Sequence, residues 1–324
     1  MTEWTLSRAL NEALRDALRN DDRVLVFGED VGVSGGVFRV TDGLQTEFGE
    51  RRVFDTPISE AAIVGSAVGL AFAGWRPVVE LQFDAFSYPA FEQIVDHVAK
   101  MRMRTRGRVD MPITIRIPSF GGIKGKEHHG ESPETYYAHT AGLKVVVPSN
   151  PQDGYALLQH AIRDPDPVIV LEPKARYWSK GNVDLTSDEP GIGFGSVVRK
   201  GGDVTLVAYG SMVARVMDAA TQLADAGIDA RVIDLRSLSP LPDGLLRVCA
   251  EETGRIVVVH EAPRHGGFGA EIAARTMELA FDSLAAPVAR VTGWDVPYPP
   301  ASLEDDYLPS VDRIVAAAKE TVAY

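Results

Sequence analysis

The chain has 324 residues, 45% of them hydrophobic and 24% charged, which is typical of a globular protein with a core large enough for two domains. Its formal net charge of −12 argues against non-specific nucleic-acid binding, because such binding requires cations that neutralise phosphates. The single Cys249 excludes an intramolecular disulfide and fits a reducing compartment. No signal segment is recognisable, and the longest apolar run, 61–75, is too short to span a bilayer. We therefore expect a cytoplasmic protein that binds neither nucleic acid nor membrane.

Apolar strands alternate with helices through the first half of the chain. Leucines recur with a period near 3.6 from Leu6 to Leu18, which predicts an N-terminal helix with one buried face. Strands are predicted at 24–27, 53–54, 78–83, 113–117, 145–147 and 168–171, with helices starting near 60 and at 89–103 and 151–162. The last helix begins with Asn150 as its cap and Pro151 at its first position. This alternation predicts a mostly parallel, doubly wound α/β sheet.

A second α/β unit follows a stretch rich in proline and glycine. The periodicity is weak over 173–202, as in a linker. Beyond it, strands are predicted at 204–208, 230–235, 256–259 and 287–291, and helices at 212–226 and 269–281. We therefore divide the chain into a first domain at 1–180, a linker at 181–202 and a second domain at 203–324.

The hexapeptide 55–60, Asp-Thr-Pro-Ile-Ser-Glu, carries the strongest candidate for chemistry. It places Glu60 at the start of an apolar helix of small residues, with Ser59 as a candidate N-cap. A carboxylate at the mouth of such a helix is desolvated, which raises its proton affinity and suits it to acid–base work. The alternative is that Glu60 only complements the helix dipole. Gly65 and Gly69 favour the first interpretation, because they clear one helix face for a ligand or another backbone.

Two further clusters are candidates for the same site. The glycine-rich loop 121–130 holds His128 and His129, of which we expect only one to face a cavity. Zinc ligation is one interpretation, but the sequence has neither a His-Glu-x-x-His motif nor paired Cys-x-x-Cys motifs, so a catalytic histidine is favoured. Phe83 and Phe86 follow a predicted strand. Aromatic clusters are usually core, yet ligands bind at the carboxyl ends of parallel strands.

These motifs together resemble a known family. The spacing of Glu60, Gly65 and Gly69 resembles the pyrimidine-side signature of thiamine diphosphate enzymes, although Ser66 replaces the usual large apolar residue. The Gly-Asp-Gly motif with which such enzymes hold magnesium and diphosphate is absent from the sequence, so we expect half of a site. Nearly the whole chain closely resembles the β subunit of the thiamine-dependent decarboxylating component of 2-oxo acid dehydrogenase complexes. The motifs that carry this resemblance lie at 28–32, 55–60, 92–94, 99–100, 139–146 and 293–297.

The resemblance implies a fold, a partner and a reaction. It implies a pyrimidine-binding domain followed by a transketolase C-terminal-type domain, in a heterotetramer of two α and two β chains. Thiamine diphosphate is then shared with the α subunit, which holds the diphosphate and the magnesium. A 2-oxo acid is oxidatively decarboxylated, and its acyl group passes to a lipoyl group of the dihydrolipoyl acyltransferase.

It also implies roles for individual residues. Glu60 is the catalytic carboxylate that bonds N1′ of the aminopyrimidine, and Glu29 is a further cofactor-binding carboxylate. Phe86 matches the aromatic residue that stacks on the pyrimidine. His129 matches the histidine that assists acyl transfer, whereas His128 matches no family histidine. Relatives also bind structural potassium, largely through backbone carbonyls, and the matching positions are Ile113, Ala161, Ile162, Asp164 and Asp166, the last replacing the usual asparagine.

The substrate class rests on two short motifs. The runs 132–134, Ser-Pro-Glu, and 172–174, Glu-Pro-Lys, are more similar to the branched-chain form than to the pyruvate form. A pyruvate or acetoin dehydrogenase β subunit is the alternative. A different class, a non-catalytic α/β subunit such as an electron-transfer flavoprotein chain, leaves the Glu60 helix and the His129 loop unexplained.

Overall fold

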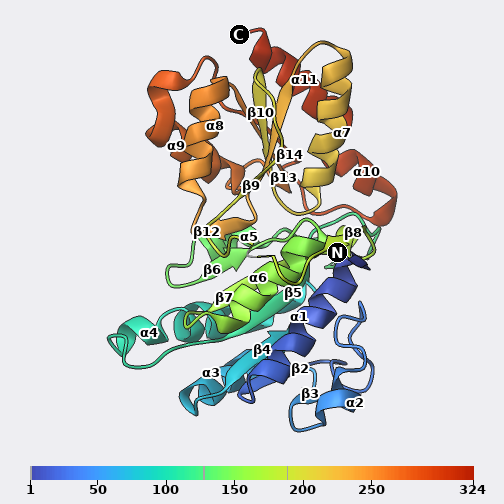
Figure 1. Ribbon diagram of the computed structural model, residues 1–324, viewed down its shortest axis with the longest axis vertical. Helices are drawn as coiled ribbons and strands as arrows, with labels where there is room; N and C mark the ends of the chain where they lie inside the picture. The colour runs from blue at the N-terminus through green and yellow to red at the C-terminus, as the bar shows by residue number, and fades with distance from the viewer. Residues whose placement is uncertain (1, 127, 188) are drawn as a thin grey trace.

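The chain forms two α/β domains, each built on its own sheet, in a computed structural model that describes residues 2–126, 128–187 and 189–324 (Figure 1). The first sheet has seven strands in the order β12-β6-β7-β5-β4-β2-β3. These strands are β2 (Val24–Gly28), β3 (Val53–Asp55), β4 (Arg76–Glu80), β5 (Thr114–Ser119), β6 (Lys144–Val146), β7 (Val168–Pro173) and β12 (Ser237–Ser239). All pair in parallel except β12, which comes from the second half of the chain and pairs antiparallel with β6.

The second sheet has five strands in the order β14-β13-β10-β11-β9. They are β9 (Ser196–Arg199), β10 (Val204–Ala208), β11 (Ala230–Asp234), β13 (Ile256–Pro263) and β14 (Ala289–Gly293). Only β9 is antiparallel to its neighbour. A separate two-stranded ribbon joins β1 (Thr2–Thr5) to β8 (Lys180–Val183). The expected linker at 181–202 therefore contains most of β8 and all of β9.

Helices cover the sheets as the α/β alternation predicts. The larger ones are α1 (Leu6–Asn20), α3 (Glu60–Phe72), α6 (Pro151–Arg163), α7 (Met212–Asp225), α8 (Asp243–Thr253), α9 (Gly269–Ala280) and α11 (Val311–Val322). Short helical segments are α2 (Leu44–Phe48), α4 (Met101–Arg104), α5 (Glu134–Ala138), α10 (Glu304–Tyr307) and the turns η1 (Ala85–Ala90), η2 (Gln93–Val98), η3 (Lys174–Arg176), η4 (Phe281–Ser283) and η5 (Ala301–Leu303). Among the described residues, no helix combines the length and apolar character that crossing a membrane requires.

Local chemistry explains where two of these helices begin. The Thr5 hydroxyl accepts a hydrogen bond from the Arg8 amide at the start of α1, and the Asn150 side chain accepts one from the Asp153 amide at the start of α6. The leucine stripe of α1 is buried, as predicted, and α1 packs beside α6 (Figure 1).

The predicted helix at 89–103 is wrong as a single helix. Residues 85–104 instead form a 3₁₀ turn, a π-helical turn and the short α4 in succession. Pro89 lies inside the first turn and has no amide hydrogen to donate, which breaks a regular ladder there.

One apolar core joins the two domains. Buried residues of the first sheet, such as Ile115 and Val147, belong to the same hydrophobic cluster as Tyr209, Ile233 and Val258 of the second sheet. Separate clusters lie under α1 and α6 and under α7 and α11. The pairing of β12 with β6 and this shared core fix the second domain against the first. The contact region includes α5, which packs against β12.

Candidate active site

The candidate site residues gather at one edge of the first sheet. Glu29 follows β2, Glu60 begins α3 just after β3, Phe83 follows β4, and the 121–130 loop follows β5. Because these strands are parallel and adjacent, their carboxyl ends meet at the same edge. The topology therefore brings together residues that lie up to 100 positions apart in the sequence.

A pair of carboxylates, Glu29 and Glu60, occupies this edge. Glu29 is buried, and its Oε1 atom has no hydrogen-bond partner among the described residues. Burial raises the pKa of Glu29, and the charges of Glu60 and Asp30 raise it further, while a hydrogen bond from the Ser59 backbone opposes them. Glu60 remains partly exposed, and Ser59 occupies the N-cap position without a side-chain cap bond. Of the two carboxylates, Glu29 is therefore the more deeply buried.

The Asp55 carboxylate helps to hold the end of the Gly-Glu-Asp-Val-Gly motif at 28–32 in place. Asp55, at the end of β3, accepts hydrogen bonds from the amides of Gly32 (2.6 Å) and Val33 (3.3 Å). A Cβ atom on Gly32 would lie 2.8 Å from an Asp55 oxygen and 2.4 Å from the Gln45 amide nitrogen. A side chain at position 32 would therefore displace the Gln45 and Asp55 side chains that pack against this loop.

His129 packs against two aromatic rings. Its ring centroid lies 4.3 Å from that of Phe83 and 5.3 Å from that of Phe86, edge-to-face in both cases. The two phenylalanine rings are themselves 5.5 Å apart. His128 is exposed and has a positive φ of 68°. The two histidines therefore diverge, and it is His129 that the fold brings to Phe86.

Buried ion pairs lie beneath this edge of the sheet. Arg116 of β5 contacts Glu80 of β4 at 2.6 Å and Glu172 of β7 at 2.7 Å, and all three side chains are buried. Lys174 pairs with Asp84, whose carboxylate also accepts a hydrogen bond from the Ala85 amide. The Glu-Pro-Lys motif at 172–174 thus contributes two residues to buried pairs. Sequence reasoning missed Arg116, although a charge inside an apolar strand is a signal of such a pair.

The expected potassium positions do lie together, around the end of α6. The Arg76 guanidinium donates to the carbonyls of Ile162 (2.9 Å) and Asp164 (3.2 Å). Lys144 pairs with the Asp164 carboxylate at 2.7 Å and with that of Asp166 at 3.2 Å. Arg76 and Lys144 therefore already contact oxygens that the potassium ion would use. Each carbonyl oxygen still has a second lone pair with which it can bind an ion. The potassium site stays a prediction.

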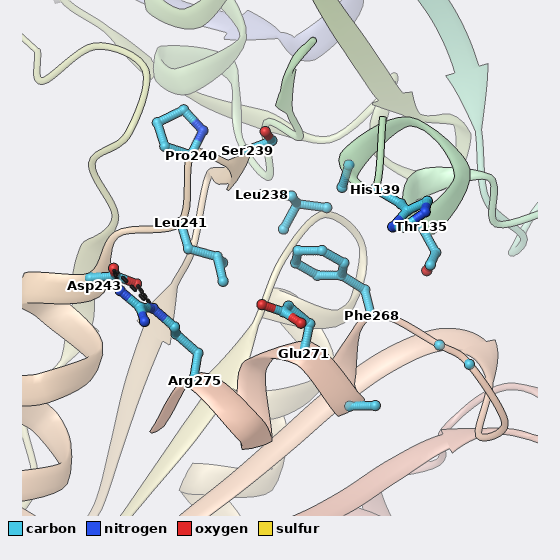
Figure 2. A pocket seen from close by; sticks show the side chains of 14 residues that line it. Thr135, His139, Leu238, Ser239, Pro240, Leu241, Asp243, Phe268, Glu271 and Arg275 are labelled. Atoms are coloured by element: carbon cyan, nitrogen blue, oxygen red, sulfur yellow. Dashed lines mark hydrogen bonds and ion pairs between the residues drawn. The ribbon is translucent and has the colours of Figure 1, made fainter. Parts of the chain in front are cut away.

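A separate cavity of about 550 Å³ lies where the domains meet (Figure 2). Leu238, Leu241 and Phe268 point into it, and His139 lies at its edge, as Figure 2 shows. The ion pair between Asp243 and Arg275 forms part of its wall. This hollow belongs to α5, β12, α8 and α9, whereas the carboxylates lie at the β2–β3 edge.

The residues at the sheet edge fit the pyrimidine half of thiamine diphosphate. A buried carboxylate oxygen without a partner can bind a ring nitrogen or a hydroxyl group, and an aromatic side chain offers a face for stacking. Gly65 and Gly69 were expected to clear one face of α3. A Cβ on Gly65 would lie 3.1 Å from the Gln93 side chain, whereas Gly69 faces open space.

Comparisons with known proteins decide the family. Residues 2–179 match the family described as "Transketolase, pyrimidine binding domain", and residues 193–314 match "Transketolase, C-terminal domain". The chain is 57% identical over 314 residues to the "3-methyl-2-oxobutanoate dehydrogenase subunit beta" of Mycobacterium tuberculosis, covering 96% of this chain and 90% of that protein. The chain belongs to the family of 2-oxo acid dehydrogenase β subunits.

Two further relatives support this assignment. The "Pyruvate dehydrogenase E1 component subunit beta" of Leifsonia xyli is 51% identical, covering 98% of this chain and 94% of the relative. A solved structure titled "Split gene transketolase, inactive beta4 tetramer" superposes with a TM-score of 0.78 at 26% identity over 98% of both chains. These comparisons confirm the family resemblance, the transketolase-like fold and a thiamine diphosphate-dependent class of enzyme. The flavoprotein alternative is set aside.

Proposed function

We propose that this chain supplies the pyrimidine half of a thiamine diphosphate site in a branched-chain 2-oxo acid dehydrogenase. The observation that carries the proposal is the buried Glu29 oxygen without a partner, next to Glu60 at the start of α3. The aromatic cluster of Phe83, Phe86 and His129 lies at the same sheet edge. When bound, the cofactor supplies the electron sink that allows a 2-oxo acid to lose carbon dioxide.

Each residue has a role that its surroundings support. Glu60 bonds N1′ of the aminopyrimidine and exchanges a proton there. Glu29 contributes a second cofactor-binding carboxylate at the same edge of the sheet. Phe86 provides the stacking face. His129, supported by Phe83 and Phe86, donates a proton or hydrogen bond during transfer of the acyl group to the lipoyl group of a dihydrolipoyl acyltransferase.

The other half of the site comes from an α subunit in a tetramer of two α and two β chains. The sequence lacks the Gly-Asp-Gly motif that holds magnesium and diphosphate, so these ligands are assigned to the α subunit. Helix α3 supports the presence of a partner. It is apolar on all sides, yet Phe72 is 50% exposed and a Cβ on Gly69 would meet open space. A helix with apolar residues all round is expected to be buried.

The proposed substrate is 3-methyl-2-oxobutanoate or a similar branched-chain acid. The relative with 57% identity bears that substrate in its name, and this chain carries Ser-Pro-Glu at 132–134. The relative with 51% identity favours pyruvate as the second candidate. We place the assembly in the cytoplasm, where the buried free thiol of Cys249 stays reduced.

A co-expression experiment tests the substrate. The chain is produced together with a 2-oxo acid dehydrogenase α subunit from the same organism, and lipoyl-domain acylation is measured with both 2-oxo acids. The two extra methyl groups of the branched substrate predict a kcat/KM at least about tenfold higher than for pyruvate. A preference for pyruvate would overturn this part of the proposal and leave the family assignment intact.

A potassium site at Ile113, Ala161, Ile162, Asp164 and Asp166 is part of the same proposal. The test is the thermal midpoint of the assembled enzyme in potassium chloride and in choline chloride at equal ionic strength. A specific site predicts a higher midpoint with potassium, since a ligand that binds only the folded state stabilises it. Equal midpoints would count against the site.

A further inference from the structure

The 121–130 loop, which carries His129, has its base closed within the first domain. The Phe120 amide donates to the Glu131 carbonyl at 3.0 Å, so the two ends of the loop meet. Phe120, Lys124 and His128 all adopt positive φ angles, of 72°, 53° and 68°. Non-glycine residues rarely adopt this conformation, so further contacts must hold the loop in place.

Those contacts come from the second domain. Glu304, the first residue of α10, is only 2% exposed. Its Oε1 accepts a hydrogen bond from the Gly122 amide at 3.1 Å, and its Oε2 accepts one from the Lys124 amide at 2.9 Å. Glu261, on β13, accepts a hydrogen bond from the Gly121 amide at 2.8 Å. Figure 1 shows α10 at the boundary between the two domains.

The side chain of Tyr298 completes this attachment. Its hydroxyl donates to Glu304 Oε1 at 2.7 Å. A Cβ on Gly121 would lie 1.9 Å from the Tyr298 oxygen, and a Cβ on Gly130 would lie 2.2 Å from the Tyr298 ring. A side chain at either end of the loop would push the Tyr298 ring aside, so the two glycines allow the ring to pack over the loop. Gly130 is the residue next to His129.

We propose that Glu304, together with Tyr298, is a positioning residue for His129: the second domain fixes the histidine loop of the first. The carboxylate of Glu304 receives two backbone amides and one hydroxyl, and hydrogen bonds to a charged acceptor are the stronger kind. This inference rests on the role proposed above for His129 and extends it to a residue 175 positions further along the chain. The alternative is that Glu304 only holds the two domains together.

We call the hydrogen bonds that Glu304 accepts from Gly122, Lys124 and Tyr298 the clamp. The substitution Glu304→Gln tests the clamp in the assembled α–β enzyme. Glutamine keeps the size of the side chain but turns a donor toward the Lys124 or the Gly122 amide, so at least one bond is lost. The matched control is Asp305→Asn, whose carboxylate is exposed and pairs at 2.9 Å with the Lys124 ammonium. Tyr298→Phe is a milder second variant, because it removes only the hydroxyl and keeps the ring over the glycines.

Two readouts separate positioning from general stability. Amide hydrogen exchange at Gly122 and Lys124 should accelerate about tenfold or more in Glu304→Gln, as expected for loss of a hydrogen bond to a charged group. Acylation of a lipoyl domain should fall about tenfold in kcat/KM, while decarboxylation coupled to an artificial electron acceptor changes less than about twofold. Tyr298→Phe should shift both readouts in the same direction by less, and Asp305→Asn should leave them unchanged.

The double variant Glu304→Gln/His129→Ala shows whether the clamp acts through the histidine. If it does, Glu304→Gln causes no further loss of acylation once His129 is absent. Unchanged amide exchange in both Glu304→Gln and Tyr298→Phe, or equal losses in the two activities, would overturn the clamp. If amide exchange is faster in Glu304→Gln but His129→Ala still acylates the lipoyl domain normally, the role proposed for His129 is wrong.

Discussion

Replacing Glu134 by glutamine should remove a pH dependence from the stability of this protein. Glu134 is the first residue of α5 and is fully buried between the domains. Its Oε1 accepts a hydrogen bond from the Tyr209 hydroxyl at 2.7 Å, and its Oε2 has no partner among the described residues. Burial raises the pKa of Glu134 from 4.5 to about 7, although the bond from Tyr209 opposes this rise.

The sign follows from proton binding. A carboxyl whose pKa is higher in the folded state binds its proton more tightly there, so its stabilising contribution is complete below pH 4.5 and is lost as the pH rises through about 7. The gap between these two values, at 1.36 kcal/mol per pH unit, corresponds to about 3 kcal/mol. Glutamine stays neutral and still accepts the Tyr209 hydrogen bond. We therefore expect the parent protein to lose about 2.5 kcal/mol of this relative to Glu134→Gln between pH 5 and pH 8, because part of the loss occurs below pH 5.

Urea unfolding of the two proteins at both pH values measures this difference directly. Tyr209→Phe is the control that tests whether the surroundings of Glu134 set its pKa. It removes a hydrogen bond that lowers the pKa of Glu134, so the pH-dependent loss should extend to higher pH. Parallel stability curves for the parent and Glu134→Gln across this range would refute the reasoning.

Three further predictions follow from the site. Calorimetry on the isolated chain should show weak binding of thiamine diphosphate without dependence on magnesium, and tight magnesium-dependent binding would contradict the half-site argument. His129→Ala should impair lipoyl acylation more than acceptor-coupled decarboxylation, with a smaller effect for His128→Ala; equal losses in the two assays would argue against a role in acyl transfer. Arg116→Met leaves Glu80 and Glu172 buried without their cation, so urea titrations should show the free energy of unfolding falling by about 3–5 kcal/mol. An unchanged free energy of unfolding would show that the two carboxyl groups are protonated in the folded protein.

Much of the fold could be predicted because local patterns and tertiary packing agree. The leucine stripe of α1 and the apolar strands of both sheets lie within a few residues of their predicted positions. Elements that depend on distant partners could not be predicted. Strand β12 exists because Ser237 and Ser239 pair with β6, and β8 exists because it pairs with β1. Helix α11 is absent from the predicted elements, although Ile314 and Ala318 are buried on one face.

The candidate site could be proposed from the sequence where its residues form a local pattern. Glu60 and the following glycines are one helix, so their spacing is visible in the sequence. The residues that support the site were missed because their partners lie far away in the chain. Nothing near Glu304 indicates that it accepts hydrogen bonds from Gly122 and Lys124, since only the fold brings β5 and α10 together.

The assignment of Glu60 is tested most directly by Glu60→Gln in the reconstituted α–β enzyme. Glutamine keeps the size of the side chain and can hydrogen-bond, but it cannot exchange a proton with N1′ of the aminopyrimidine. Assembly and cofactor binding should therefore survive, while exchange of the thiazolium C2 proton slows by about 10²–10⁴-fold, the usual contribution of a general acid–base group. Exchange at a near-normal rate would contradict the account and leave Glu60 as a carboxylate that only complements the dipole of α3.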